Sequence, residues 1–319
     1  MNYETDFKKA LAEAFLAKKL APSSIKLYLR NLEKLNDDMP LKNFTFLKDI
    51  PAITQQLEKY KENTQRGYLI SIVSSLGLDK SNKAKQKLYD DYYKLMMDKN
   101  KELKGKEATN EKSETQQENW ITWEEVGKTF ADLEAKVKTF SGNKEINPHQ
   151  YDVLLQYVVL ALYYYKAPRR NEYQNMTIVK TDTASLPITA NYLITDSRQF
   201  LFNAYKTAKK EGQLREDIPD ALFAVILTYL KFHPLLKGKK IIKTTAVPFL
   251  VYYDGKPLTQ VNAITRILNK TFGKAVGSSM LRHIYLSSKY GDVLQEMKED
   301  AGAMSHSVGM QKDYIKVWF

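Results

Sequence analysis

Apolar residues recur at helical spacing along the N-terminal part of the chain. Between Pro22 and Leu35 they stand three or four residues apart, which places them on one face of a helix with Ser23 or Ser24 as its N-cap. A second run, from Thr64 to Leu76, repeats this spacing and is stopped by Gly77. We therefore expect this part of the chain to be helical throughout.

The C-terminal part mixes helical spacing with one stretch of alternation. Thr122 and Glu125, just after Trp120, have the spacing of a capping box and predict the start of a helix. Between Ile188 and Pro219 apolar and polar residues alternate around a turn, which predicts a small antiparallel β-sheet. Further helices are expected at 153–165, 221–232, 259–272 and 278–290. The buried stripe expected for the helix at 259–272 consists of Val261, Ile264, Ile267 and Leu268.

The residues at 100–119 are almost wholly polar. Such a segment buries too little apolar surface to offset the entropy lost on ordering, so it is expected to be a linker. It separates a smaller region, 1–99, from a larger one, 120–319. The fold class predicted is mainly α, with a helical N-terminal domain and a second helical domain that holds the small sheet.

Charge and composition narrow the classes of partner and chemistry. The chain has 49 lysines and arginines against 37 acidic residues, a net charge of +12 that suits a polyanion, although a basic surface alone would also give it. It has no cysteine, which excludes disulfides and thiolate zinc sites. No apolar stretch approaches the roughly 18 residues of a membrane span, and the N-terminus lacks a signal-peptide core. We expect an intracellular protein with no membrane partner.

Several common catalytic motifs are missing, but a series of basic motifs runs along the second region. There is no phosphate-binding loop of the G-x-x-x-x-G-K-[ST] type, no H-E-x-x-H and no G-x-S-x-G. In chain order the region contains Pro-Arg-Arg-Asn-Glu at 168–172, Tyr-Lys-Thr at 205–207, Leu-Arg-His at 281–283, Ser-His-Ser at 305–307, and then Tyr314.

This order resembles the catalytic set of the tyrosine recombinases, the phage-type integrases. Arg169, with Glu172 three residues later, matches the first arginine box of that family, and Arg170 is the alternative. Standing alone, the two arginines would be read as a basic helix end. Lys206 is similar to the family's lysine on a β-hairpin, with Lys209 and Lys210 as competitors; a hairpin lysine by itself is usually only solvated.

The later boxes match with two departures. Leu-Arg-His at Arg282 and His283 resembles the second arginine box, but Ser279 stands where the family has His or Lys. Ser-His-Ser around His306 resembles the family's L-G-H-S box with serine in place of glycine, and Tyr314 follows eight residues later, about one fewer than is usual.

The resemblance implies a defined chemistry. A phenol is a poor nucleophile at neutral pH, so Tyr314 would need a proton acceptor and a positive field when it attacks a DNA phosphate. Arg169 and Arg282 would hold the non-bridging oxygens, with His306 as a third donor, because guanidinium groups offer paired donors and stay protonated. Lys206 would protonate the departing 5′ oxygen. His283 would be a base or a supporting residue, and Glu172 would orient an arginine.

The resemblance also implies a fold, a partner and an assembly. Residues 1–99 would be a SAM-like core-binding domain and 120–319 the catalytic domain, clamped around double-stranded DNA as a homo-tetramer on two sites. No cofactor is implied. The sequence Pro-Arg-Arg-Asn-Glu-Tyr at 168–173 is similar to sequences in integrases of large DNA viruses and their satellite elements. The residues expected to touch DNA, chiefly its phosphates, are Lys26, Arg30, Lys34, Gln65 and Arg66.

Three other functions fit parts of the same pattern. A type IB topoisomerase would use a similar site to relax supercoils as a monomer. A DNA-binding protein of the same fold without catalysis would keep the basic surface, although the joint presence of all five motifs argues against it. A helical RNA-binding protein with chance matches is the fourth possibility.

Overall fold

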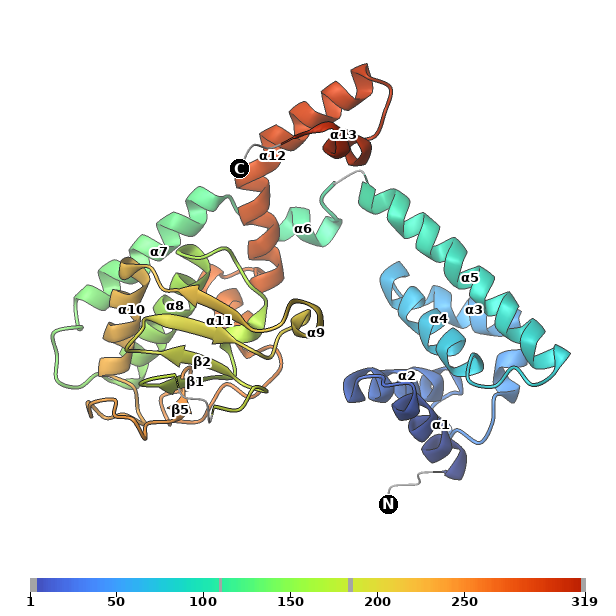
Figure 1. Ribbon diagram of the computed structural model, residues 1–319, viewed down its shortest axis with the longest axis horizontal. Helices are drawn as coiled ribbons and strands as arrows, with labels where there is room; N and C mark the ends of the chain where they lie inside the picture. The colour runs from blue at the N-terminus through green and yellow to red at the C-terminus, as the bar shows by residue number, and fades with distance from the viewer. Residues whose placement is uncertain (1–4, 109–110, 183–185, 317–319) are drawn as a thin grey trace. The chain divides into compact units, whose positions relative to one another are not determined.

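The computed structural model describes residues 5–108, 111–182 and 186–316. The chain forms two compact units, Met1–Lys112 and Ser113–Phe319 (Figure 1). Both units are mainly helical, and the second also contains a small five-stranded sheet of mixed direction. No helix in the described part of the chain is both long and apolar enough to cross a lipid bilayer.

The first unit is a bundle of helices around one apolar core. Its core comes mainly from α2 and α4, which pack on each other, and α5 covers α4. The apolar face predicted for α2 is confirmed, since Ile25, Leu29, Leu32 and Leu35 are all buried. The predicted cap is wrong, because the N-cap is Ala21 and Pro22 begins the helix ahead of Ser23 and Ser24. Gly77 ends α4 as predicted. The elements of this unit are α1 (Asp6–Ala17), α2 (Pro22–Leu35), η1 (Thr45–Lys48), α3 (Ile50–Glu58), α4 (Glu62–Leu76) and α5 (Lys83–Ala108).

The segment expected to be a linker is largely helical. Helix α5 continues to Ala108, and α6 (Glu114–Asn119) begins after the division between the two units at Lys112. Leu103 is buried on the first unit, and Glu102 forms ion pairs with Lys99 and Lys106 on the same helix. One buried leucine and pairs at three- and four-residue spacing stabilise a helix that the polar composition did not predict.

The second unit places its sheet against a layer of helices. Thr122 and Glu125 form the predicted capping box at the start of α7. Helices α7, α8, α10 and α11 share one core with one face of the sheet. The helices of this unit after α6 are α7 (Trp123–Lys138), α8 (Pro148–Tyr164), η2 (Asn171–Tyr173), α9 (Ala208–Glu211), α10 (Asp220–Lys231), α11 (Ala263–Phe272), α12 (Ser278–Ala303) and α13 (Val308–Tyr314).

The sheet has the order β4-β3-β2-β1-β5. The predicted antiparallel pair is present, with Tyr192 opposite Leu201, but β1 runs parallel to β2, so the sheet is not purely antiparallel. Side chains alternate between the helical core on one face and a small cluster with Leu186 and Ala190 on the other. The strands are β1 (Met176–Val179), β2 (Asn191–Ile194), β3 (Gln199–Phe202), β4 (Leu214–Asp217) and β5 (Val247–Pro248).

Two helices differ from their predicted bounds. Helix α11 starts only at Ala263, and Val261, predicted to be buried in its stripe, lies before the helix and is 90% exposed. The reason is local, because the preceding residues form a turn whose carbonyls accept hydrogen bonds from Gln174 and Asn171. Helix α12 does not stop near Tyr290 but continues to Ala303, away from the sheet, with α13 at its outer end (Figure 1).

His233 supplies a test of the core of the second unit. Its side chain is buried, and Nε2 lies 3.0 Å from the carbonyl oxygen of Pro248. Burial lowers the pKa of His233, because the charged imidazolium is disfavoured away from water. Below the ordinary histidine pKa the unfolded chain therefore binds a proton that the folded chain does not, and stability falls as the pH falls.

We expect the free energy of unfolding by urea to drop more between pH 7.5 and 5.5 in the wild type than in His233→Gln. The extra loss should be about 1 kcal/mol, since each pH unit below the ordinary pKa contributes about 1.4 kcal/mol per proton. His149→Gln, which removes an exposed histidine, should keep the wild-type slope. An identical drop in His233→Gln and wild type would contradict the buried neutral state.

Candidate functional site

A short turn between α8 and β1 carries the two adjacent arginines. Helix α8 ends at Tyr164, and Pro168 follows shortly after, where proline disfavours a helical conformation at the residue before it. Arg170 is extended, with φ −68° and ψ −158°, and the single turn of η2 follows. We call residues 168–173 the arginine turn.

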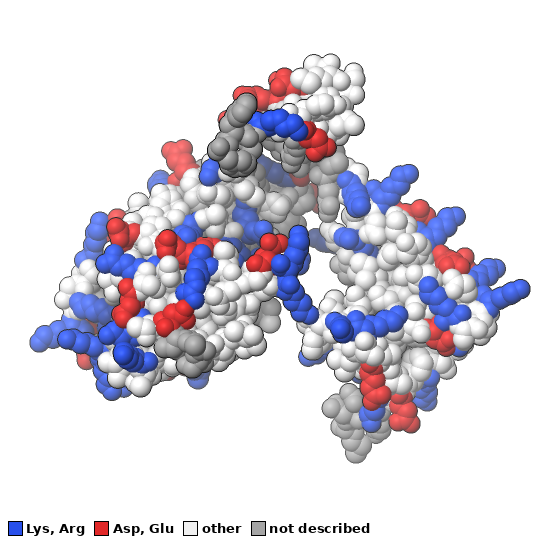
Figure 2. Space-filling view, in the orientation of Figure 1, with Lys and Arg blue, Asp and Glu red and all other residues white. Residues whose placement is uncertain are grey.

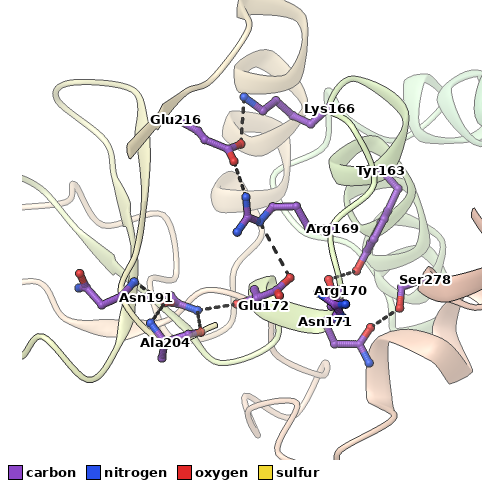
Figure 3. A network of polar contacts seen from close by, with 11 residues as sticks. Tyr163, Lys166, Arg169, Arg170, Asn171, Glu172, Asn191, Ala204, Glu216 and Ser278 are labelled. Atoms are coloured by element: carbon purple, nitrogen blue, oxygen red, sulfur yellow. Dashed lines mark hydrogen bonds and ion pairs between the residues drawn. The ribbon is translucent and has the colours of Figure 1, made fainter. Parts of the chain in front are cut away.

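Hydrogen bonds hold the arginine turn from three sides (Figure 3). The Tyr163 hydroxyl donates to the carbonyl oxygen of Arg170 at 3.0 Å, and the Ser278 hydroxyl donates to Oδ1 of Asn171 at 2.7 Å. Nδ2 of Asn191 donates to the carbonyl oxygen of Glu172 at 3.1 Å. Burial raises the pKa of Tyr163 well above its usual value, so its hydroxyl stays a proton donor.

Helix α12 begins beside the arginine turn. Its N-cap is Gly277, which has no side chain that could cap the first turn. The first backbone amide groups of the helix therefore have neither a capping side chain nor an intrahelical partner. A Cβ at Gly277 would lie 2.8 Å from Cγ2 of Thr265 on α11, so glycine allows the close approach of these two helices. The helix start carries partial positive charge.

An open pocket of about 540 Å³ lies between the arginine turn and the start of α12. Two guanidinium groups line it, from Arg170 and Arg282, and neither forms a hydrogen bond or ion pair with a described side chain. Ser279 and His283, both exposed, line the same pocket. No aspartate or glutamate is among the described residues that line it. The pocket is therefore positively charged and suited to an anion.

Arg169 lies outside this pocket and is paired with carboxylates (Figure 3). Its Nη1 is 2.5 Å from Oε1 of Glu216 on β4, and its Nε is 3.9 Å from Oε2 of Glu172. Lys166 lies 3.2 Å from the other oxygen of Glu216. The side chain of Arg169 is only 16% exposed, so the structure places Arg169 and Glu172 in a largely buried ion-pair cluster and Arg170 on the pocket.

Lys206 lies in the connection between the antiparallel strands β3 and β4, as expected for a hairpin lysine. Its side chain is exposed and has no hydrogen bond or ion pair with any described residue. Lys209 and Lys210 are on α9 in the same connection, and Lys210 pairs with Glu211. Of the three lysines, Lys206 is the nearest in sequence to the end of β3.

His306 and Tyr314 form a separate pair at the outer end of α12. Their rings lie 5.8 Å apart, Nε2 of His306 is buried without a hydrogen-bond partner, and Tyr314 is 71% exposed. Ser305 has φ 57°, a left-handed conformation that favours glycine, and it stands where the L-G-H-S box has glycine. Because a helix rises about 1.5 Å per residue, the outer end of α12 is about 30 Å along its axis from Arg282.

The residues expected to bind DNA in the first unit lie on two packed helices. Lys26 and Arg30 on α2 are exposed and Lys34 is half-buried. On α4, Arg66 is half-buried, and Gln65 donates to the carbonyl oxygen of Tyr60 at 2.8 Å, so its amide is already used. Basic side chains are spread over the visible face of this unit and mixed with acidic ones (Figure 2).

The expected five-residue site is thus distributed over four places, of which the β3–β4 connection with Lys206 is one. The structure brings Arg282, Ser279 and His283 together with Arg170, leaves Arg169 among carboxylates, and holds His306 and Tyr314 apart. Sequence reasoning missed Asn191, Ser278 and Glu216, which fix the turn. The only signal was a polar residue, Asn191, at the start of an apolar strand. Among the described residues, no three histidine or acidic side chains are placed to hold a metal ion.

The two adjacent arginines should differ sharply in their effect on stability. Arg169→Ala would leave the carboxylates of Glu216 and Glu172 largely buried without their partner, at a cost of about 3 kcal/mol. Arg170→Ala removes an exposed side chain without a partner and should change stability by less than about 0.5 kcal/mol. Urea unfolding of the two variants measures the difference, and equal losses would contradict the arrangement.

No protein-family model, no curated protein and no solved structure matches this chain. The similarity to tyrosine recombinases therefore rests on the motifs in the sequence.

Proposed function

We propose that this protein cuts and rejoins DNA through a covalent bond to Tyr314, as a site-specific recombinase or integrase of the tyrosine recombinase type. The observation that carries the proposal is the pocket lined by Arg170 and Arg282, two guanidinium groups without carboxylate partners, beside the start of a long helix. A DNA phosphodiester is the anion that best fits these donors together with the net charge of +12.

In the proposed reaction Arg170 and Arg282 hold the non-bridging oxygens of the scissile phosphate. The Tyr314 oxygen bonds to phosphorus, its proton passes to His283, and the bond from phosphorus to the 5′ oxygen breaks. Lys206 gives that oxygen a proton. The product is a 3′-phosphotyrosyl bond and a free 5′ hydroxyl. Because the phosphodiester energy is kept, attack by a 5′ hydroxyl of another strand reverses the step without ATP.

The position of Tyr314 imposes a condition on this proposal. Tyr314 is held on α13 at the outer end of α12, whereas Arg282 is near the beginning of that helix. Cleavage within one copy therefore requires α12 to bend, so that its outer half and α13 approach the pocket lined by Arg170 and Arg282. Gly291, in the middle of α12, favours a bend there, because glycine is about 1 kcal/mol less favourable than alanine inside a helix.

The first unit would supply sequence-independent affinity in this proposal. Lys26, Arg30, Lys34 and Arg66 would contact DNA phosphates, which give affinity that falls with salt. Assembly of four copies on two DNA sites, and a role in the integration of a viral or other mobile element, follow from the resemblance and belong to the proposal.

The separation of Tyr314 from the pocket favours a second candidate function, a DNA-binding protein of the same fold that does not cut. Both candidates bind phosphate through Arg170 and Arg282. They differ in whether a covalent bond forms.

The central test is a denaturant-resistant adduct with DNA. A nicked duplex, selected from a random-sequence pool by covalent capture on the wild-type protein, should give an adduct on a denaturing gel. Tyr314→Phe should give none, because it lacks the attacking oxygen. Tyr290→Phe, which changes an exposed tyrosine on α12, should react like wild type. If the wild type captures no duplex, the proposed cleavage is contradicted, and the second candidate, a DNA-binding protein that does not cut, is favoured.

Stiffening α12 should slow the reaction. Gly291→Ala adds a methyl group that meets no atom within 4 Å, so it favours the straight helix without a clash. A cost of about 1 kcal/mol for bending should slow adduct formation about fivefold, with DNA binding unchanged. Gly302→Ala, the same change near the end of α12 and equally unobstructed, is the matched control. Equal rates for the two variants would show that bending at Gly291 is not required.

A further inference from the structure

A buried asparagine connects the arginine turn to the loop that carries Lys206. Asn191, the first residue of β2, is 4% exposed. Its Nδ2 donates to the carbonyl oxygens of Glu172 at 3.1 Å and of Ala204 at 3.0 Å (Figure 3). Its Oδ1 accepts from the backbone amides of Asn203 at 2.9 Å and of Ala204 at 2.8 Å. Both donors and both acceptor positions of the amide are used, which fixes its orientation.

The groups joined by Asn191 belong to two different parts of the site. Glu172 is two residues after Arg170, which lines the pocket. Ala204 is two residues before Lys206, in the connection that follows β3. The backbone positions of the pocket arginine and of the lysine are therefore set relative to each other through one side chain.

The Lys206 loop is otherwise held by contacts of its own and by Arg169. The Tyr205 hydroxyl donates to the carbonyl oxygen of Gly212 at 2.8 Å, which closes the loop. The guanidinium carbon of Arg169 lies 4.0 Å from the ring centre of Phe202 and 5.6 Å from that of Tyr205. The ring of Tyr173, in the arginine turn, also packs on Phe202 at the end of β3, with 5.7 Å between ring centres. Among the described contacts, the hydrogen bonds of Asn191 are the ones that join the backbone of the arginine turn to that of the loop.

We propose that Asn191 is a positioning residue that places Lys206 at the leaving oxygen of the phosphate bound by Arg170 and Arg282. This inference rests on the proposed cleavage reaction. As the phosphorus bond to the 5′ oxygen breaks, the electron pair goes to that oxygen and a proton comes from the Lys206 ammonium. Proton transfer requires hydrogen-bond reach, and a displacement of about 1 Å can cost about 100-fold in rate.

A duplex with sulfur in place of the bridging 5′ oxygen distinguishes a positioning role of Asn191 from a general structural role. A thiolate leaves without being protonated, because the pKa of a thiol is far below that of an alcohol. A variant that only misplaces the proton donor is therefore slow on the oxygen duplex and close to wild type on the sulfur duplex. A variant that damages phosphate binding or the fold is slow on both.

The experiment compares adduct formation on the two duplexes, each with the sequence captured by the wild type. Asn191→Asp is the informative variant, because it keeps an acceptor oxygen for the backbone amides of Asn203 and Ala204. It removes the donor to the carbonyl oxygens of Glu172 and Ala204, and with it the link to the arginine turn. It should be about 100-fold slower on the oxygen duplex, within threefold of wild type on the sulfur duplex, and should match Lys206→Ala. Arg282→Ala should be slow on both duplexes. Thr195→Val, which removes a hydroxyl at the other end of β2, should be normal on both.

Two results would overturn the inference while leaving the proposed function intact. One is a wild-type rate for Asn191→Asp on the oxygen duplex, and the other is an equal loss on both duplexes. Asn191→Ala removes all four hydrogen bonds, and its rate of adduct formation must also return close to the wild-type rate on the sulfur duplex. Such a return shows that the variant is folded, because an unfolded protein would react with neither duplex. If the wild type cuts neither duplex, the proposed function fails and this inference fails with it.

Discussion

The arrangement of charged side chains in the second unit depends on the hydrogen bonds that hold the arginine turn. Its backbone and side chains accept hydrogen bonds from α8, α12 and β2, through Tyr163, Ser278 and Asn191. Gln174, immediately after the turn, donates to the carbonyl oxygen of Gln260 before α11 at 2.6 Å. The arginine turn, half of which lies outside regular structure, is thereby tied to α8, α12 and β2, and the residue after it to the segment before α11. Its two adjacent arginines are thus held in different surroundings.

The two adjacent arginines have different surroundings. Arg169 is balanced by carboxylates in a largely buried cluster, where loss of any partner is costly. Arg170, one residue later in extended chain, faces the pocket with Arg282 and keeps its donors free. A free guanidinium pair beside a helix start is an arrangement that an incoming phosphate can complete, because the protein itself supplies no competing carboxylate there.

Local patterns in the sequence predicted what depends on local physics. The spacing of apolar residues predicted α2 and α4, and the capping box at Thr122 predicted the start of α7. The neighbourhood of Ser279, Arg282 and His283 also follows from helical spacing. Strand β5 could not be predicted, because it has two residues and a partner far away in sequence. Nor could the sequence decide between Arg169 and Arg170, since that choice depends on Glu216 and on the pocket, which only the tertiary fold supplies.

The central claim, that Tyr314 forms a bond to DNA, is tested most directly by mapping that bond. Protease digestion of the captured complex, followed by mass spectrometry, identifies both the modified residue and the DNA end. We predict a peptide that contains Tyr314 linked to a 3′ phosphate, with a free 5′ hydroxyl on the released strand. A bond to another residue, or a 5′ phosphate linkage, would contradict it.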